Sequence, residues 1–176
     1  MSKKFTRRRY NSPTALWRDL RQAFRLRPAL RNVRAEIPPA FRERLMLAVT
    51  AVNECRYCSY FHAAQALKAG LPEQEMRSLL AGDLPDDVPA EEIAGLLYAQ
   101  HWAEQSGQPD PEARRGLVQA YGERKAQAIE AVLLMIQIGN LSGNSGDYLL
   151  YRLSFGRWGD PPARQGRADL PLTSPK

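Results

Sequence analysis

Helical periodicity, interrupted at intervals by glycine and proline, is the feature that most restricts the fold of this chain. Apolar residues recur at spacings of three and four through most of the sequence, as they do on one face of an α-helix. The alternating Val, Ile and Thr runs and the Asn-Gly hairpins that are typical of strands do not occur. The sequence therefore predicts an all-α protein built as a compact helical bundle.

Glycine and proline also mark where the individual helices should begin and end. We expect helices over residues 13–27, 38–52, 55–70, 71–82, 89–106, 110–122, 123–141 and 145–154. The second of these is apolar nearly all round at residues 45–49, which predicts that it is buried. In the fifth, the core candidates are Ile93, Leu96, Leu97 and Tyr98.

Positive charge is concentrated at the N-terminal end of the chain. Residues 1–36 hold eleven Lys and Arg against two acids, a net charge of +9, whereas the rest of the chain carries −3. We therefore divide the chain into a basic arm with an amphipathic helix (residues 1–35), a helical domain (residues 36–155) and a mobile tail (residues 156–176).

The basic arm is expected to be disordered over residues 1–12 and helical after Pro13. On that helix Leu16, Leu20 and Phe24 share one face. We expect this face to dock on the body of the protein or on a neighbouring subunit. An arm of this charge could instead meet nucleic acid or an anionic membrane surface, which we keep as an alternative.

Composition argues against membrane and secreted classes. The longest apolar run is residues 131–136, far below the roughly 20 residues of a membrane-spanning helix. The chain has two cysteines only three positions apart, whereas a secreted disulfide scaffold has more and spaces them widely. We expect a soluble, cytoplasmic protein, in which a lone Cys-x-x-Cys pair indicates redox catalysis or metal binding.

The segment from Cys55 to His62 carries the chemistry. Cys55, Cys58 and His62 are spaced by three and four residues, so they lie on one stripe of a helix. Cysteines in the first turn face unpaired backbone N–H groups and the positive end of the helix dipole, which stabilises a thiolate. A nearby imidazole can add to this or can serve as a base.

A carboxylate partner for His62 can be found from chain geometry. Asn53 lies between two expected helices and is nearly equidistant from Glu43 and His62. In one straight rod Glu43 and Cys55 would be roughly 18 Å apart, but in an antiparallel pair folded at Asn53 the carboxylate comes beside His62. A carboxylate in a mostly apolar helix is costly to bury unless it is paired or functional. This predicts a Glu43–His62–Cys58 proton relay, with Cys55 completing the dithiol.

These residues reproduce a known pattern. Glu43, eleven intervening residues, Cys55-x-x-Cys58 and His62 four residues later resemble the signature of the alkylhydroperoxidase D-like proteins, within the carboxymuconolactone decarboxylase family. A later segment, Asn140-x-x-x-Asn144-x-x-Asp147, also resembles the end of family members, and the resemblance covers roughly residues 36–155.

The resemblance implies an all-α fold that assembles as trimers or hexamers, and peroxide reduction by cysteine chemistry. The residue matching Cys58 would attack the hydroperoxide and become a sulfenic acid. The residue matching Cys55 would donate a proton and then close the disulfide, His62 and Glu43 would move protons, and a dithiol reductant, a protein or a lipoyl-type group, would reopen the disulfide. Tyr57 stands where redox members often carry His, and Tyr is no base near neutral pH.

Other interpretations of the same residues stay open. Cys55 and Cys58 could be two small core residues, or two ligands of a zinc ion with His62 and either Glu43 or His101. His62 alone could be an ordinary helix histidine, and His101 a packing or surface residue.

Other carboxylates, aromatic residues and reactions were weighed as well. Glu54 could pass for the functional carboxylate, but beside the first cysteine it more readily stabilises the helix start. Tyr57, Tyr60 and Phe61 are expected to line a pocket or a subunit interface. A lactone decarboxylase with residual cysteines and a nucleic-acid-binding or assembly module are the competing functions. We assign no cofactor and no metal.

Overall fold

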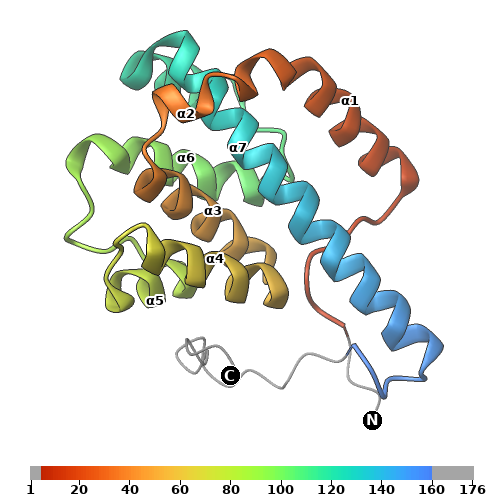
Figure 1. Ribbon diagram of the computed structural model, residues 1–176. Helices are drawn as coiled ribbons and strands as arrows, with labels where there is room; N and C mark the ends of the chain where they lie inside the picture. Colours follow the sequence, from red (N-terminus) through yellow and green to blue (C-terminus); the bar gives the residue numbers. More distant parts are fainter. Residues whose placement is uncertain (1–4, 160–176) are drawn as a thin grey trace.

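The structure is a computed structural model that describes residues 5–159, and these residues form helices without any strand. Figure 1 shows their arrangement. The helices are α1 (Pro13–Leu30), α2 (Val33–Glu36), α3 (Pro39–Asn53), α4 (Arg56–Lys68), α5 (Glu73–Ala81), α6 (Ala90–Glu104) and α7 (Pro111–Leu153). The predicted all-α class is confirmed.

Helix ends fall close to the positions that Gly and Pro indicate. Ser12 caps α1 by accepting a hydrogen bond from the Ala15 backbone N–H, and Pro39 occupies the first position of α3. Gly82 ends α5 with φ 93°, a left-handed conformation that favours glycine. The short helix α2 was not predicted, because four residues are too few to show a period.

The last long helix differs from the prediction. The expected break at Gly122 exists, as a kink with φ 73° and ψ 159° inside α7. The second expected break, between residues 141 and 145, is wrong, because α7 continues to Leu153. The polar and glycine residues around it indicate a loop by composition, but Asn144 and Asp147 face inward, and Asn144 is fully buried and hydrogen-bonded.

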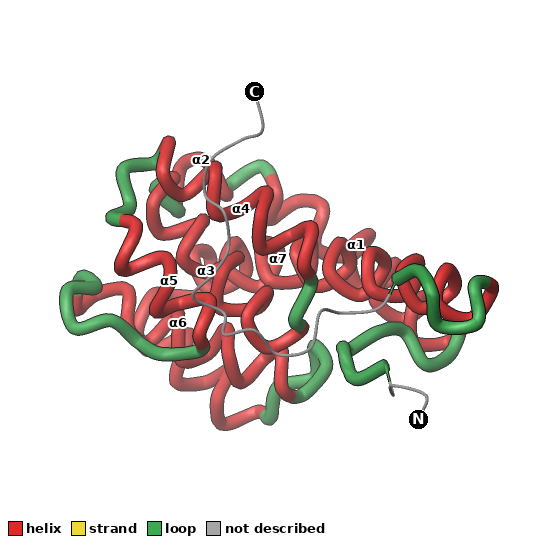
Figure 2. Tube along the Cα trace, turned by 90° about the horizontal axis from the view of Figure 1, so that it is seen from below, coloured by secondary structure: helices red, strands yellow, loops and turns green. Residues whose placement is uncertain are grey.

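Helix α7 runs diagonally across the molecule and organises the other helices. Figure 1 shows α1 lying along α7 in the opposite direction, and Figure 2 shows the same pair side by side from another direction. On the other side of α7, α3 lies at the centre and packs against α4, α5, α6 and α7. The segment that carries the cysteines therefore lies where α3, α4 and α7 meet.

The hydrophobic core follows from this arrangement. Its largest fully buried apolar side chains come from α3, α5, α6, α7 and the α2–α3 connection: Ile37, Phe41, Leu45, Leu47, Met76, Leu79, Leu96, Trp102, Ile129, Leu133 and Leu134. Burial of residues 45–49 is confirmed except for Met46, which is half-buried. The expectation that Leu97 is a core residue is wrong, because it is 52% exposed on the outer side of α6.

The apolar face of α1 was expected to dock on the body of the protein or on a neighbouring subunit; it does not dock on the body, and docking on a neighbouring subunit stays a prediction. Leu20 and Phe24 are 45% and 69% exposed, so the strongly apolar face points outward. The opposite face packs on α7 through Leu26 and Asp19, and the Asp19 carboxylate accepts hydrogen bonds from Tyr10 Oη and Gln137 Nε2. An aspartate can be buried when its oxygens are paired in this way, and the pairing stabilises this face of α1 against α7.

The segment before α1 is not disordered over its described part. Residues 5–12 follow the surface of α7, and Arg7 is buried with its Nη1 2.7 Å from Asp147 Oδ2. The arm is thus tied to the end of α7. Of the predicted mobile tail, residues 160–176 lie outside the described residues. The division into an arm, a domain and a tail stays a prediction.

A buried ionic cluster links three helices on the side of α3 away from α1. The Arg44 guanidinium contacts Glu75 of α5, and its Nη1 lies 3.0 Å from Glu92 Oε2 of α6. Burial raises the pKa of the Glu92 carboxyl, and Arg44 opposes this shift. The cluster fixes the relative positions of α3, α5 and α6 around the core.

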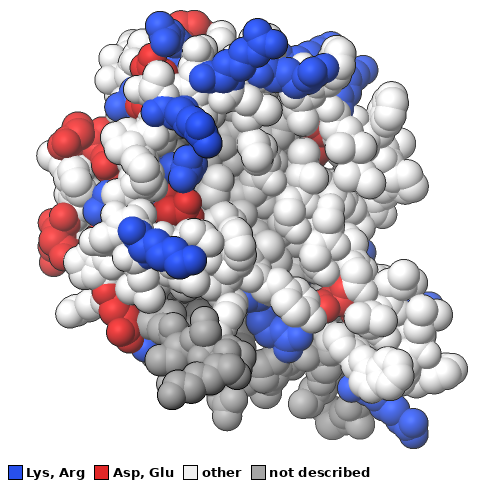
Figure 3. All heavy atoms as spheres, viewed as in Figure 1, with Lys and Arg blue, Asp and Glu red and all other residues white. Residues whose placement is uncertain are grey.

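Charges on the outer surface are segregated. Figure 3 shows Lys and Arg gathered along the edge where α1 lies, with acidic side chains along the edge where the α5–α6 loop lies. Exposed arginines of α1 include Arg21, Arg25 and Arg27. Within the described residues, no helix combines the length and hydropathy needed to cross a membrane.

Candidate redox site

The two cysteines form a disulfide at the start of α4. Cys55 is the N-cap residue of this helix and Cys58 lies in its first turn, with the two Cα atoms 5.3 Å apart. The Cys55 sulfur also accepts a hydrogen bond from the Cys58 backbone N–H. Glu54, with φ 56°, is the C-cap of α3 and reverses the chain between the two helices. The sulfurs thus lie at the positive end of the α4 dipole, as the spacing predicts.

The two sulfurs differ in accessibility. Cys55 is fully buried, and a Cβ atom added at Gly143 of α7 would lie 3.4 Å from its sulfur. Cys58 is half-buried and lines a pocket. A small molecule in that pocket therefore has access to the Cys58 sulfur and not to that of Cys55.

The predicted antiparallel pairing of α3 and α4 brings Glu43 against His62. His62 Nδ1 lies 2.9 Å from Glu43 Oε2, and the Glu43 side chain is 6% exposed. With the proton on Nδ1, the imidazole donates to this carboxylate and keeps Nε2 as an acceptor. Arg42 Nε lies 3.6 Å from the other Glu43 oxygen, so the carboxylate has a cationic neighbour as well.

A pocket of about 350 Å³ opens beside Cys58 and His62. Apart from these two residues its walls are apolar or glycine, with one tyrosine: Met46 from α3, Tyr57 and Phe61 from α4, and Met135, Ile136 and Gly139 from α7. The sequence indicated Tyr57, Tyr60 and Phe61 as residues of a pocket or a subunit interface; Tyr57 and Phe61 line this pocket, and Tyr60 does not. The sequence did not indicate the α7 wall, because an apolar run such as residues 131–136 looks the same whether it faces core or pocket.

Asparagines of α7 support the disulfide loop from behind. Asn144 Nδ2 donates to the Asn53 carbonyl oxygen at 2.8 Å and to the Arg8 carbonyl oxygen at 2.7 Å. Asn140 and Thr50 bond through their side chains within the same interface. The Asn140-x-x-x-Asn144 spacing thus places both amides on the face of α7 that contacts the end of α3.

The remaining candidates of the sequence lie elsewhere. His101 does not line the pocket, and its Nε2 lies 2.8 Å from Asp110 Oδ2 at the start of α7. Glu54 is exposed at the turn before Cys55. Among the residues that the structure describes, no group of three or more His, Cys, Asp and Glu side chains is arranged to hold a metal ion.

The fold and the site define a class of protein: an all-helical chain with a Cys-x-x-Cys disulfide at a helix start and a glutamate–histidine pair behind it. The model of the carboxymuconolactone decarboxylase family matches residues 20–101, from the middle of α1 to the end of α6, which contain all four site residues. The predicted family is therefore confirmed over this part of the chain. No curated protein and no solved structure matches the chain.

Proposed function

We propose that the protein is a thiol-dependent peroxidase that reduces hydroperoxides with the Cys55–Cys58 dithiol. One observation carries the proposal: the accessible sulfur, Cys58, shares a pocket with an imidazole that a buried carboxylate orients, while the second sulfur is within bonding distance. This combination supplies a nucleophile, a base and a resolving thiol at one place.

The reaction begins from the reduced dithiol. His62 takes the proton of the Cys58 thiol, and the thiolate attacks the terminal oxygen of the hydroperoxide. The O–O bond breaks, Cys58 becomes a sulfenic acid, and the alkoxide leaves as an alcohol after receiving the proton. The Cys55 thiol then attacks the sulfenic sulfur, water leaves, and the disulfide forms. Glu43 holds the imidazole and stabilises its charged form.

Pocket chemistry favours an organic hydroperoxide over hydrogen peroxide as substrate. Two methionines, an isoleucine and two aromatic side chains line the pocket beside the sulfur. They can bind the apolar group of an organic hydroperoxide, and hydrogen peroxide has no such group. Tyr57 and Phe61 are 56% and 58% exposed at the rim, where they can contact a dithiol reductant, a protein or a lipoyl-type group. We propose that the chain works as a homo-oligomer in the cytoplasm, where such reductants keep dithiols open.

The competing functions make different demands on the same residues. A lactone decarboxylase reaction would not use the redox chemistry of the dithiol. A nucleic-acid module would need the arginines of the arm, of which Arg7 is instead buried in an ion pair with Asp147 and Arg8 bonds carbonyl oxygens at the end of α6. We therefore place the activity at the dithiol.

A test of the proposal follows the thiols through one turnover. The reduced full-length protein is mixed with one equivalent of cumene hydroperoxide, and the thiols are counted before and after, with mass spectrometry to locate the bond. We expect two thiols to disappear, a Cys55–Cys58 disulfide to form and cumyl alcohol to appear in equal amount. Cys55→Ser should stop at the sulfenic acid, because the resolving thiol is missing.

Cys58→Ser is the decisive control. It keeps Cys55, the pocket and the fold, so it separates attack by Cys58 from any other consumption of peroxide. If Cys58→Ser consumes hydroperoxide as fast as the unchanged protein, or if both thiols survive the peroxide, the protein is not a peroxidase of this kind.

A further inference from the structure

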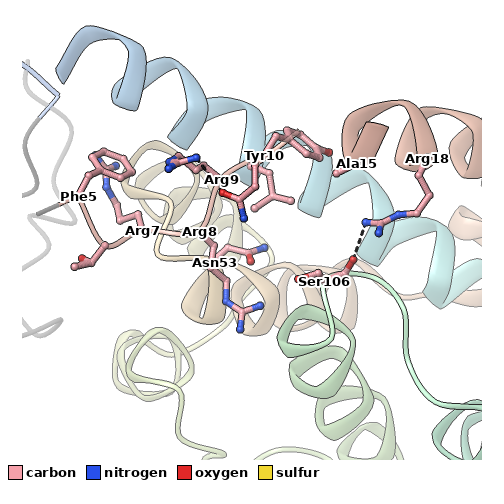
Figure 4. Close-up of a pocket in the computed structure, with 12 residues that line it drawn as sticks. Phe5, Arg7, Arg8, Arg9, Tyr10, Ala15, Arg18, Asn53 and Ser106 are labelled. Carbon is pink, nitrogen blue, oxygen red and sulfur yellow. Dashed lines mark hydrogen bonds between the residues drawn. The ribbon is translucent and has the colours of Figure 1, made fainter. Parts of the chain in front are cut away.

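A second pocket lies where the N-terminal segment crosses α7, on the side of the disulfide loop away from the redox pocket. It has a volume of about 470 Å³, and four arginines line it: Arg7, Arg8 and Arg9 of the arm and Arg18 of α1. Figure 4 shows these side chains around the pocket, with Asn53 among them and Arg18 bonded to the Ser106 carbonyl oxygen. We call it the arginine pocket. No acidic side chain is among its lining residues.

Two of the four arginines have their charge balanced and two do not. Arg7 pairs with Asp147 at 2.7 Å and Arg18 with Asp19 at 2.9 Å. Within residues 5–159, Arg8 and Arg9 form no ion pair. Arg8 Nη1 donates to neutral carbonyl oxygens at the end of α6, and Arg9 Nη1 donates to the Asn11 side chain while its guanidinium lies over the Tyr148 ring. Among the described residues, the pocket thus carries two positive charges that no carboxylate compensates.

Hydrogen-bond donors without acceptors occur at the buried side of this pocket. Asn53 is 1% exposed, and its side-chain Nδ2 has no hydrogen-bond partner within residues 5–159. Nε of the buried Arg7 has no partner there either. A buried donor without an acceptor costs free energy comparable to a lost hydrogen bond, so such groups are rare in folded proteins. Both residues line the pocket. What the pocket lacks is therefore acceptor oxygen and negative charge.

We propose that the arginine pocket binds a small dianion, a phosphate group or a phosphate monoester. A phosphate dianion brings two negative charges to two uncompensated guanidinium groups. Its oxygens accept several hydrogen bonds at once, which suits a pocket lined by the N–H groups of arginine side chains. The volume exceeds what inorganic phosphate alone needs, so the pocket also has room for the organic part of a monoester.

The position of the pocket gives a bound anion a structural consequence. Asn53 ends α3, two residues before Cys55, and its carbonyl oxygen shares the Asn144 amide with the carbonyl oxygen of Arg8. A ligand held by Arg8 and Arg9 would fix the arm against this same junction. The site is separate from the redox pocket, and the proposal does not depend on the peroxidase activity.

Calorimetric titration of the full-length protein with inorganic phosphate tests the proposal. The total ionic strength is held constant with sodium chloride, so that only specific binding produces saturable heat. We expect one phosphate per chain, and methyl phosphate should bind in the same way. Malonate, a dianion of different shape, is titrated in parallel, and we expect it to bind at least tenfold more weakly.

Three arginine variants complete the test. Arg8→Gln and Arg9→Gln each remove one guanidinium from the pocket, and each should weaken phosphate binding about tenfold, the effect of one charge-assisted hydrogen bond. Arg25→Gln removes the same charge from the exposed face of α1 and should change binding less than about twofold. Circular dichroism shows whether each variant retains its helices. If Arg8→Gln does not fold, Arg9→Gln alone tests the contribution of the pocket arginines to phosphate binding.

Three results would overturn the proposal. The first is the absence of saturable heat up to about 10 mM phosphate, a concentration at which even weak sites fill. The second is equal weakening by Arg25→Gln, which would mean that net charge alone attracts the anion. The third is tighter binding of malonate than of phosphate, which would assign the pocket to carboxylates.

Discussion

Glu43, the carboxylate hydrogen-bonded to His62, is buried, and its surroundings indicate its chemical role. Glu43 is buried in an apolar helix, and a carboxylate there costs free energy unless its charge is used. In Glu43→Gln the amide still contacts the imidazole but no longer stabilises its charged form. We expect disulfide formation after peroxide addition to slow by about 10²-fold, the lower end of what a general acid–base pair contributes, as stopped-flow tryptophan fluorescence would measure.

Glu54→Gln is the matched control for this substitution. It removes a carboxylate one residue from Cys55, but this side chain is exposed and does not line the redox pocket. Its rate should stay within about threefold of the unchanged protein, because an exposed charge is screened by water. Equal slowing in both variants would mean that the rate depends on the total negative charge near the cysteines and that no proton relay through His62 exists.

The contact between Glu43 and His62 could be foreseen from the sequence, whereas the partners of Asp19 could not. A short turn forces its two helices to fold back, so positions equidistant from it meet, and only the sequence spacing is needed. Asp19 is buried by Tyr10, Arg18 and Gln137, and Gln137 is 118 residues away. Such a set depends on tertiary packing, which no local pattern encodes. For the same reason the sequence indicated the α4 wall of the redox pocket and not its α7 wall.

At the scale of elements, α6 crosses α3 at a glycine that has no room for a side chain. A Cβ atom at Gly95 would lie 2.7 Å from Phe41 Cζ and 3.1 Å from Tyr121 Oη. The Phe41 ring is fully buried and cannot swing away. We expect Gly95→Ala to lower the free energy of unfolding by about 1–3 kcal/mol, the usual cost of overpacking, in urea unfolding followed by circular dichroism.

Gly116→Ala provides the comparison for the same chemical change. Gly116 lies in α7 on the exposed side, and nothing lies within 4 Å of a Cβ atom there. Alanine has the higher helix propensity, so this substitution should raise the free energy of unfolding by about 0.5–1 kcal/mol. Stabilisation by both substitutions would contradict the close contact between α3 and α6.

The start of α7 should respond to acid. Asp110 caps this helix by accepting hydrogen bonds from the backbone N–H groups of Glu112 and Ala113. The bond from Ala113 does most to hold the pKa of its carboxyl below the ordinary value of 3.8, and His101 and the bond from Glu112 lower the pKa further. Because the folded-state pKa is lowered, the carboxylate stabilises the protein above pH 3.8 and loses this effect as the pH falls through the lowered value.

Asp110→Asn isolates that contribution. The amide oxygen can still accept from the two N–H groups, but it carries no charge to attract them or His101. The unchanged protein should therefore be the more stable of the two near neutral pH, and the difference in unfolding free energy should shrink towards zero below pH 3.8. A difference that stays constant from neutral to acid pH would show that the charge of Asp110 does not act on the helix.

At the scale of the whole molecule, the outward apolar face of α1 bears on assembly. Its sequence predicted docking on the body or on a neighbouring subunit, and α1 reaches α7 with Asp19 and Leu26 while Trp17 and Phe24 are 68% and 69% exposed. Large aromatic side chains at this exposure are unusual for a chain that works alone. The amphipathic pattern was a correct indication of a helix, but it could not tell the body of the protein from a neighbouring copy as the docking partner.

Self-association through the exposed face of α1 is the prediction that follows. Burying Trp17 and Phe24 would contribute about 3 kcal/mol each from the area removed from water. We expect the full-length protein to sediment as an oligomer at micromolar concentration, and the double variant Trp17→Ser/Phe24→Ser to sediment at lower mass with unchanged helix content. Leu97→Ser, which removes an exposed leucine from α6, should leave the mass unchanged. An unchanged mass in the double variant would place the subunit contact elsewhere, and a monomeric parent protein would exclude the oligomer altogether.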